Sequence, residues 1–349
     1  MKNVLMASSA IVGAAVLAAS PAAAQELELS GFQDFMASGG DADADGSDRG
    51  FGFTTNTEVH VNGSIMADNG ITFGFRVEFE ADAGSSNTNT NVDENSIWAS
   101  GSFGKLEFGQ NDGAEDSFMI NGSFTGTQFG GVGNPTSNFL TSAYAGAART
   151  TADIATDSGD ATKITYTTPN FNGFSAGLSY TPSTAHDQRG NNFDDADGGT
   201  HDHIGVGLGY EGEFNGVGLN LGLVGAFGHA DEEPEDEVYG IGGGVMVSFA
   251  GFSFAVGAGM DEGNGDDDGN WAIDAGIGYA AGPWGFSING VMSEDEFTDD
   301  ELIAGSANVD YNLAPGVTVF LTGFVGEEDL GSGDDNDIVA VTSGLRLAF

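Results

Sequence analysis

Apolar residues recur at every second position along most of this 349-residue chain. From Ile71 to Phe79 the odd positions carry Ile, Phe, Phe, Val and Phe, while the even positions from Thr72 to Glu80 carry Thr, Gly, Arg, Glu and Glu. This alternation predicts a β-strand between two environments, because successive side chains point to opposite faces of a sheet. In a soluble sandwich the apolar faces meet in a core, whereas in an outer-membrane barrel they meet lipid and the polar faces line a lumen. The alternation alone leaves both architectures open.

The same pattern predicts sixteen strands, an even number, as an antiparallel barrel with both chain ends on one side requires. The predicted strands are 26–37, 51–66, 70–83, 93–101, 104–111, 161–168, 173–182, 201–212, 216–229, 237–250, 252–261, 270–281, 284–294, 300–312, 316–327 and 336–349.

The connections between these strands alternate strictly between short and long. Seven are tight turns, several with the Gly, Asn or Pro that turns favour, and eight are longer. The longest, 112–160, follows the fifth strand. A barrel with short turns at one rim and long loops at the other has this asymmetry. A connection as long as 112–160 is usually functional.

The N-terminus predicts an exported protein. Lys2 precedes an apolar stretch from Val4 to Leu17, and small residues follow up to Ala24. This is the organisation of a secretory signal peptide. We therefore expect residues 1–24 to be removed and residues 25–349 to form one barrel domain, with 112–160 as its constriction loop.

The chain is strongly acidic, with 8 basic and 53 acidic residues. Phosphate binding needs positive patches, so a nucleic-acid partner is excluded. Disorder is excluded too, because 40% of the residues are hydrophobic and in ordered alternation. Acidic runs fall at or beside the long connections, and such runs repel one another unless cations, calcium among them, lie between them. Asp41, Asp43 and Asp45 resemble the start of a calcium loop, but Gly52 stands where its last ligand belongs, so a solvated acidic loop is favoured over a weak calcium site.

The sequence offers little for catalysis. It contains no cysteine, and its five histidines, His60, His186, His201, His203 and His229, are scattered. His201 and His203 begin a predicted strand and share a face, so a metal site there is one interpretation and a polar pair at a loop edge the favoured one. We expect no enzyme and no cofactor, except calcium at acidic loops.

Three segments resemble the general-diffusion porins of Gram-negative bacteria, in particular the alphaproteobacterial type. Gly104–Gln110 resembles the strand before the porin constriction loop, Tyr166–Tyr180 resembles the hairpin after it, and Gly344–Phe349 resembles the terminal strand with its final aromatic residue. The resemblance implies an all-β, sixteen-stranded antiparallel transmembrane barrel with an infolded constriction loop. It also implies a homotrimer in outer-membrane lipid, inserted by the machinery that reads Phe349, through which small hydrophilic solutes and ions diffuse.

The resemblance further implies that acidic residues of the loop face basic residues of the wall across the narrowest part of the pore. The loop side is expected from Asp112, Glu115 and Asp116, with Asp153, Asp157 and Asp160 further along, and the wall side from Arg76, Lys105, Lys163 and Arg346.

This sequence departs from the family pattern because a dense arginine ladder is not visible, and Arg76 stands beside Glu78 and Glu80. Arg76 either forms the field across the pore or pairs locally with one of these glutamates. Local pairing leaves the lumen more uniformly negative. We therefore predict a water-filled channel that favours cations. The alternative is an acidic, calcium-binding surface β-protein or adhesin without a channel.

Overall fold

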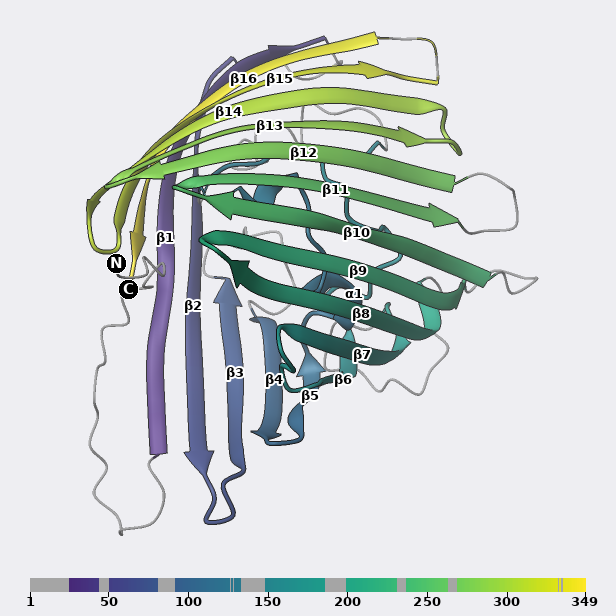
Figure 1. Cartoon of the computed structure of the whole chain (residues 1–349). Coiled ribbons are helices and arrows are strands. Elements are labelled where there is room, and N and C mark those ends of the chain that lie inside the picture. The colour runs from purple at the N-terminus through teal and green to yellow at the C-terminus, as the bar shows by residue number, and fades with distance from the viewer. Residues whose placement is uncertain are drawn as a thin grey trace.

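The chain folds into one closed barrel of sixteen antiparallel strands, seen in a computed structural model (Figure 1). The structure describes residues 25–43, 50–80, 92–125, 127, 129–132, 148–185, 199–230, 237–262, 269–331, 333 and 335–349. The expected signal peptide, 1–24, lies outside these residues. The strands are β1 (Gln25–Ala42), β2 (Gly52–Met66), β3 (Thr72–Glu80), β4 (Val92–Gly101), β5 (Gly104–Gln110), β6 (Thr162–Thr167), β7 (Phe174–Ser183), β8 (Thr200–Phe214), β9 (Val217–Ala230), β10 (Glu237–Phe249), β11 (Phe252–Glu262), β12 (Gly269–Ala281), β13 (Trp284–Asp295), β14 (Asp300–Ala314), β15 (Val317–Asp329) and β16 (Asp335–Ala348).

Each strand pairs with its neighbours in sequence, and the first strand pairs with the last. The seam between β1 and β16 runs from Phe32 opposite Ala348 to Ala42 opposite Ile338. Beyond it, Gly31 and Phe349 exchange two backbone hydrogen bonds of 3.1 and 2.9 Å. Closure leaves no sheet edge, so the backbone groups of the wall are satisfied by neighbouring strands.

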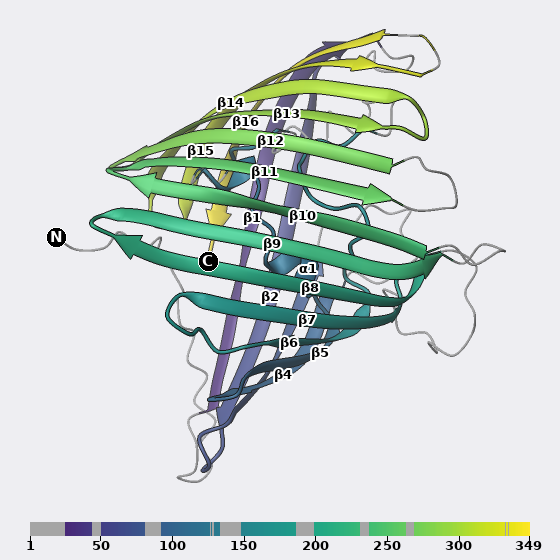
Figure 2. The same ribbon diagram turned by 45° about the vertical axis from the view of Figure 1, so that its right-hand side comes forward.

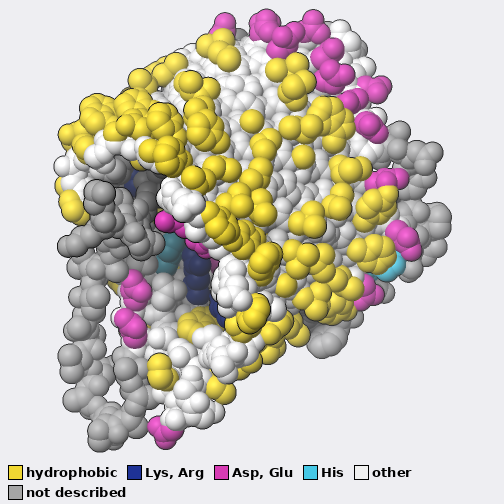
Figure 3. Space-filling model, in the orientation of Figure 1, with side chains coloured by type: hydrophobic (Ala, Val, Ile, Leu, Met, Phe, Trp, Pro, Cys, Tyr) yellow, Lys and Arg dark blue, Asp and Glu magenta, His cyan; other side chains and the backbone are white. Residues whose placement is uncertain are grey.

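The apolar stripes face outward. Leu29 on β1 is 65% exposed and Ile288 on β13 is 63% exposed, whereas the alternate residues Asp34 and Ser287 on the same strands are buried. In the space-filling view, hydrophobic side chains are spread over the outside of the barrel, and acidic side chains gather along one rim (Figure 3). An apolar exterior around a polar interior is the arrangement of a membrane barrel.

The sixteen predicted strands are confirmed. The largest difference is at the first strand, which was expected to end at residue 37 and continues to Ala42. The extension arises from pairing, because Ser38 to Ala42 stay in register with β16 although two glycines, Gly39 and Gly40, interrupt the alternation there. The sandwich alternative is wrong, because the sheet closes on itself and its apolar stripes are not buried between two layers.

Buried apolar side chains gather inside the barrel, where the connection after β5 lies against the wall. They form three clusters, of Met119, Ile154, Val224 and Ala226; of Met36, Phe129 and Phe320; and of Val132, Val291, Leu302, Ala304, Phe324, Ile338 and Ala340. Each cluster joins loop residues to the inner face of the strands. Among the described residues, no helix is long and apolar enough to cross a membrane.

Candidate functional site

The connection between β5 and β6 lies against the inner wall. It contains two short helices, α1 (Ala114–Ser117) and η1 (Gly122–Phe124), and α1 lies behind the front strands in both ribbon views (Figures 1 and 2). The Ala114 amide donates to Ser179 Oγ on β7 at 3.1 Å, and Ser306 Oγ on β14 donates to the Gly131 carbonyl at 2.7 Å. The described parts of this loop therefore reach from the inner face of β7 to that of β14 and beyond.

Glycines of the wall make room for the loop. A Cβ built on Gly205 of β8 would lie 1.5 Å from Glu115 Oε2, one on Gly244 of β10 would lie 2.1 Å from the Ile120 carbonyl, and one on Gly278 of β12 would lie 1.8 Å from the Thr125 carbonyl. No side chain fits at these positions without movement of the loop. Gly205, Gly244 and Gly278 thus belong to a glycine bed, a part of the inner wall against which the loop packs closely because no wall side chain intervenes.

Two wall carboxylates bind the loop backbone. Asp274 of β12 accepts from the Gly122 amide at 2.6 Å and, with its other oxygen, from the Ala152 amide at 3.3 Å. Asp261 of β11 accepts from the amides of Ala155 and Thr156, both at 2.8 Å. Asp274 therefore holds the outgoing and returning legs of the loop with a single side chain.

Glu115, expected on the acidic side of the constriction, is fully buried between the two legs of the loop and β7. One oxygen accepts from the Ser158 amide at 3.1 Å and its hydroxyl at 2.6 Å, and the other accepts from the Ser179 hydroxyl at 2.8 Å. Burial raises the pKa of Glu115, but the hydrogen bonds and His203, whose Nδ1 lies 4.0 Å away, outweigh it and lower the pKa. Glu115, in its ionised carboxylate form, is thus positioned to hold the loop.

Lys163 of β6 is also buried. Its ammonium group donates to the backbone carbonyls of Asn111 and Gly159, which belong to the two ends of the loop. The structure therefore places this predicted wall cation beneath the loop rather than on the cavity surface.

Arg346 of β16 binds Asp34 of β1 through two nitrogens. Its guanidinium carbon lies 4.0 Å from the centre of the Phe32 ring and 4.8 Å from that of Phe129. Phe129 in turn stacks on Phe320, with ring centres 3.8 Å apart. This arginine therefore joins the barrel seam to Phe129 of the loop through cation–π contacts.

Arg76, Lys105 and Asp112 line a cavity of about 490 Å³ between the loop and the inner faces of β2 to β6. Arg76 forms an ion pair with Glu78, the local pairing left open by the sequence, and its Nε lies 4.0 Å from Glu94 Oε2. The remaining lining residues are Asn62, Trp98, Ser100, Glu107, Asn111, Ser117, Thr165 and Thr167. The second cation, Lys105, lies 2.5 Å from Glu107 Oε2.

Carboxylates therefore predominate around the cavity. Glu94, Asp112 and Asp160 each bring an oxygen within 4.8 Å of the other two. Partial burial inside the barrel and the nearby charges of Asp112 and other acids raise the pKa of Asp116 to about 7. Burial, then repulsion by neighbouring acids, raises the pKa of Asp160 to about 6. The loop thus carries, close to Asp112, two acids whose pKa values are raised toward neutral pH.

The other predicted residues lie apart from this cavity. Glu80 is exposed at the end of β3. Asp41 and Asp43 are exposed around the end of β1, and Asp45 lies outside the described residues, so the structure describes only part of the calcium candidate. His203 is buried at the loop, where its Nε2 contacts the Thr156 carbonyl at 2.7 Å.

Sequence reasoning missed the wall residues Glu94 and Glu107 of the cavity and the loop-holding residues Asp261 and Asp274. All four are acidic residues at inward positions within predicted strands. Asp274 could have been found from the sequence. It is the one charged residue of the predicted strand 270–281, so no oppositely charged residue on that strand can pair with it.

A family model described as Gram-negative porin matches residues 7–329. The chain belongs to the Gram-negative porin family. No sequence among the curated proteins matches it.

Solved porins share the fold of this porin. An anion-selective porin from Comamonas acidovorans has a TM-score of 0.66 at 17% identity, with 93% of this chain and 100% of that chain covered. OmpT from Vibrio cholerae, described as a trimer form, has a TM-score of 0.63 at 14% identity over 93% and 100% of the two chains. A Rhodopseudomonas blastica porin mutant has a TM-score of 0.60 at 16% identity over the same shares.

Proposed function

We propose that this porin forms a water-filled channel of the outer membrane, through which small hydrophilic solutes and ions diffuse and which favours cations. The closed barrel with an apolar exterior supports the membrane location, and the family supports the channel. A homotrimer is part of the proposal, supported by the trimer form of the structurally similar OmpT.

The preference for cations rests on the charges around the cavity. Its lining includes the cations Arg76 and Lys105, each of which has a carboxylate partner in the wall. Asp112, close to Glu94 and Asp160, adds negative charge from the loop side. A permeating ion therefore meets an excess of negative charge at this level, which attracts cations and repels anions.

The fold leaves the sign of selectivity open, because the structurally similar Comamonas porin is described as anion-selective. In narrow pores the sign follows the charged side chains that line the constriction. The residues around this cavity, rather than the likeness in fold, carry the proposal.

A reversal-potential measurement tests it. The purified full chain is inserted into a planar bilayer, and the zero-current potential is recorded across a KCl gradient at pH 8. We expect the potential to have the sign of a potassium-preferring pore, and closures at high voltage to occur in three equal steps. An anion-type potential would overturn the cation preference, and two or fewer steps per insertion would overturn the trimer.

A further inference from the structure

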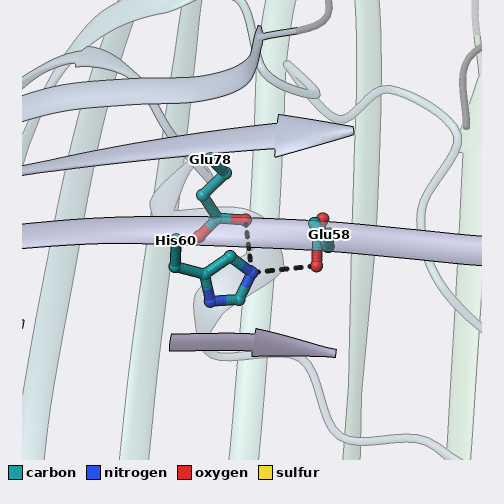
Figure 4. A group of neighbouring side chains, drawn as sticks. All are labelled: Glu58, His60 and Glu78. Carbon is teal, nitrogen blue, oxygen red and sulfur yellow. Dashed lines mark hydrogen bonds and ion pairs between the residues drawn. The ribbon is translucent and has the colours of Figure 1, made fainter. Parts of the chain in front are cut away.

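Three side chains with metal-binding atoms meet on the inner face of β2 and β3. His60 of β2 lies directly opposite Glu78 of β3 in the strand register, and Glu58 lies on the same face two residues before His60. One ring nitrogen of His60 points toward both carboxylates (Figure 4). Its Nε2 is 3.0 Å from Glu58 Oε2 and 3.7 Å from Glu78 Oε2.

These separations are close to what a small divalent ion needs. In tetrahedral zinc sites the metal lies about 2.0–2.2 Å from nitrogen and oxygen ligands, so neighbouring ligand atoms are about 3.3 Å apart. One donor from each of the three residues lies within 4.8 Å of the others. Small side-chain rotations thus bring all three donors around one ion, without movement of the paired strands.

Surrounding contacts orient two of the ligands. Glu78 is almost fully buried, and its Oε1 faces Arg76, which turns Oε2 toward His60. The Phe32 ring meets the His60 ring edge-on, with centres 6.5 Å apart and an interplanar angle of 85°. Arg76 also approaches Glu94, so its positive charge is shared with an acid outside the group. Partners of this kind fix ligand orientation and strengthen metal binding.

The site is open to the lumen on one side. The side chains of His60 and Glu58 are 19% and 18% exposed, which leaves access for an ion and room for water as a further ligand. This differs from a closed structural site, in which protein groups supply all four ligands.

We propose that Glu58, His60 and Glu78 form a lumen-facing site for a divalent transition-metal ion, with Zn²⁺ as the ion to test. A neutral imidazole suits zinc, whereas Ca²⁺ and Mg²⁺ prefer oxygen ligands alone. Glu94, Asp112 and Asp160, which offer only oxygen atoms, form the matched comparison within the same barrel.

Zinc titration of the detergent-purified full chain, without a histidine tag and stripped of metal, tests the site by calorimetry at pH 7.5. We expect one saturable Zn²⁺ site per chain that a large excess of Ca²⁺ does not displace. His60→Gln, which removes the nitrogen ligand at similar size, is expected to weaken binding at least about tenfold, the lower end of what loss of even a supporting residue costs a metal site. Folding of each variant is checked by its heat-dependent migration in SDS gels.

His229→Gln, on β9, is the matched control and leaves Zn²⁺ binding unchanged. Unaltered Zn²⁺ affinity in a folded His60→Gln protein would overturn the site, as would the absence of saturable Zn²⁺ binding. Loss of Zn²⁺ binding in Glu94→Gln but not in His60→Gln would assign the ion to the oxygen cluster and also overturn it. Because the titration is made in detergent and records no current, its result is independent of the channel proposal.

Discussion

Two acidic residues three positions apart in the same loop have different surroundings. Asp112 is exposed and lines the cavity, whereas Glu115 is buried and accepts hydrogen bonds from Ser158 and Ser179. An exposed charge acts on passing ions through the field, and a buried one acts on the structure through the groups it binds. Substitutions at the two positions should therefore have separable effects.

Asp112→Asn should weaken the preference for cations. Removal of one unit charge about 7 Å from the path of an ion raises the energy of a cation and lowers that of an anion by about 0.6 kcal/mol each in water, so the cation-to-anion permeability ratio should fall about sevenfold. Reversal potentials in a KCl gradient measure this ratio. Glu115→Gln is the contrast, with noisier single-channel currents and little change in the ratio. A ratio that falls more in Glu115→Gln than in Asp112→Asn would contradict the assignment.

At the residue scale, the alternation of side chains specifies which charges point into the barrel, and Arg76, Lys105, Lys163 and Arg346 all lie on the inward face. The alternation did not predict how deeply each charged side chain is buried. Lys163 lies beneath the loop because the carbonyls of Asn111 and Gly159 approach it from above, and those atoms belong to a segment without strand periodicity. A two-residue period specifies a face of the sheet but not what covers that face.

At the scale of elements, the loop after β5 is held by shape and by hydrogen bonds together. The glycine bed lets its backbone approach the wall, and Asp261 and Asp274 then accept from its amides. Buried amides without acceptors are costly, so these carboxylates supply what a sheet or helix would otherwise provide. The loop position is therefore a property of β8 to β12 as much as of the loop itself.

Gly278→Ala should displace the loop toward the lumen. The new methyl group would lie 1.8 Å from the Thr125 carbonyl, which has to retreat to ordinary contact, above 3.4 Å. Overpacking of this kind costs about 1–3 kcal/mol. We expect a lower single-channel conductance and faster proteolysis within the loop. Gly323→Ala on β15, where an added Cβ meets nothing within 4 Å, should behave like the parent protein. Equal conductance in the two variants would argue against the glycine bed.

The strands were predictable because each needs only a local signal, its own alternation, and because the short turns separate neighbouring strands. The loop was predictable in place and length but not in path. Its contacts join residues such as Gly122 and Asp274, which are 152 positions apart, and no local pattern specifies such a pair. Barrel closure brings such distant residues together, so that Asp274 alone binds both legs of the loop.

At the scale of the whole molecule, the net charge of −45 is distributed unevenly. Acidic side chains gather along one rim in Figure 3, and a second group of acids lies inside, around the cavity and the loop. Confinement within the barrel brings the interior acids close together in little water, which favours their protonated forms. The charge of the lumen should therefore change near neutral pH.

The preference for cations should decline from pH 8 to pH 5. The pKa of Asp116 is raised to about 7 and that of Asp160 to about 6, so both are mainly ionised at pH 8 and mainly protonated at pH 5. Reversal potentials across this range should show the cation-to-anion permeability ratio fall as each acid gains a proton. Asp116→Asn should remove the part of the change near pH 7 and keep the part near pH 6. A ratio constant between pH 8 and pH 5 would contradict this.

The glycine bed also bears on how such a channel can diversify. A methyl group added behind the loop narrows the passage without removing an ionised residue, while exchange of an exposed acid alters permeant choice and leaves the bore as it was. Width and charge are thus set by separate residues, glycines of the wall and acids of the loop. Descendants of this chain can therefore adjust each trait through its own set of residues.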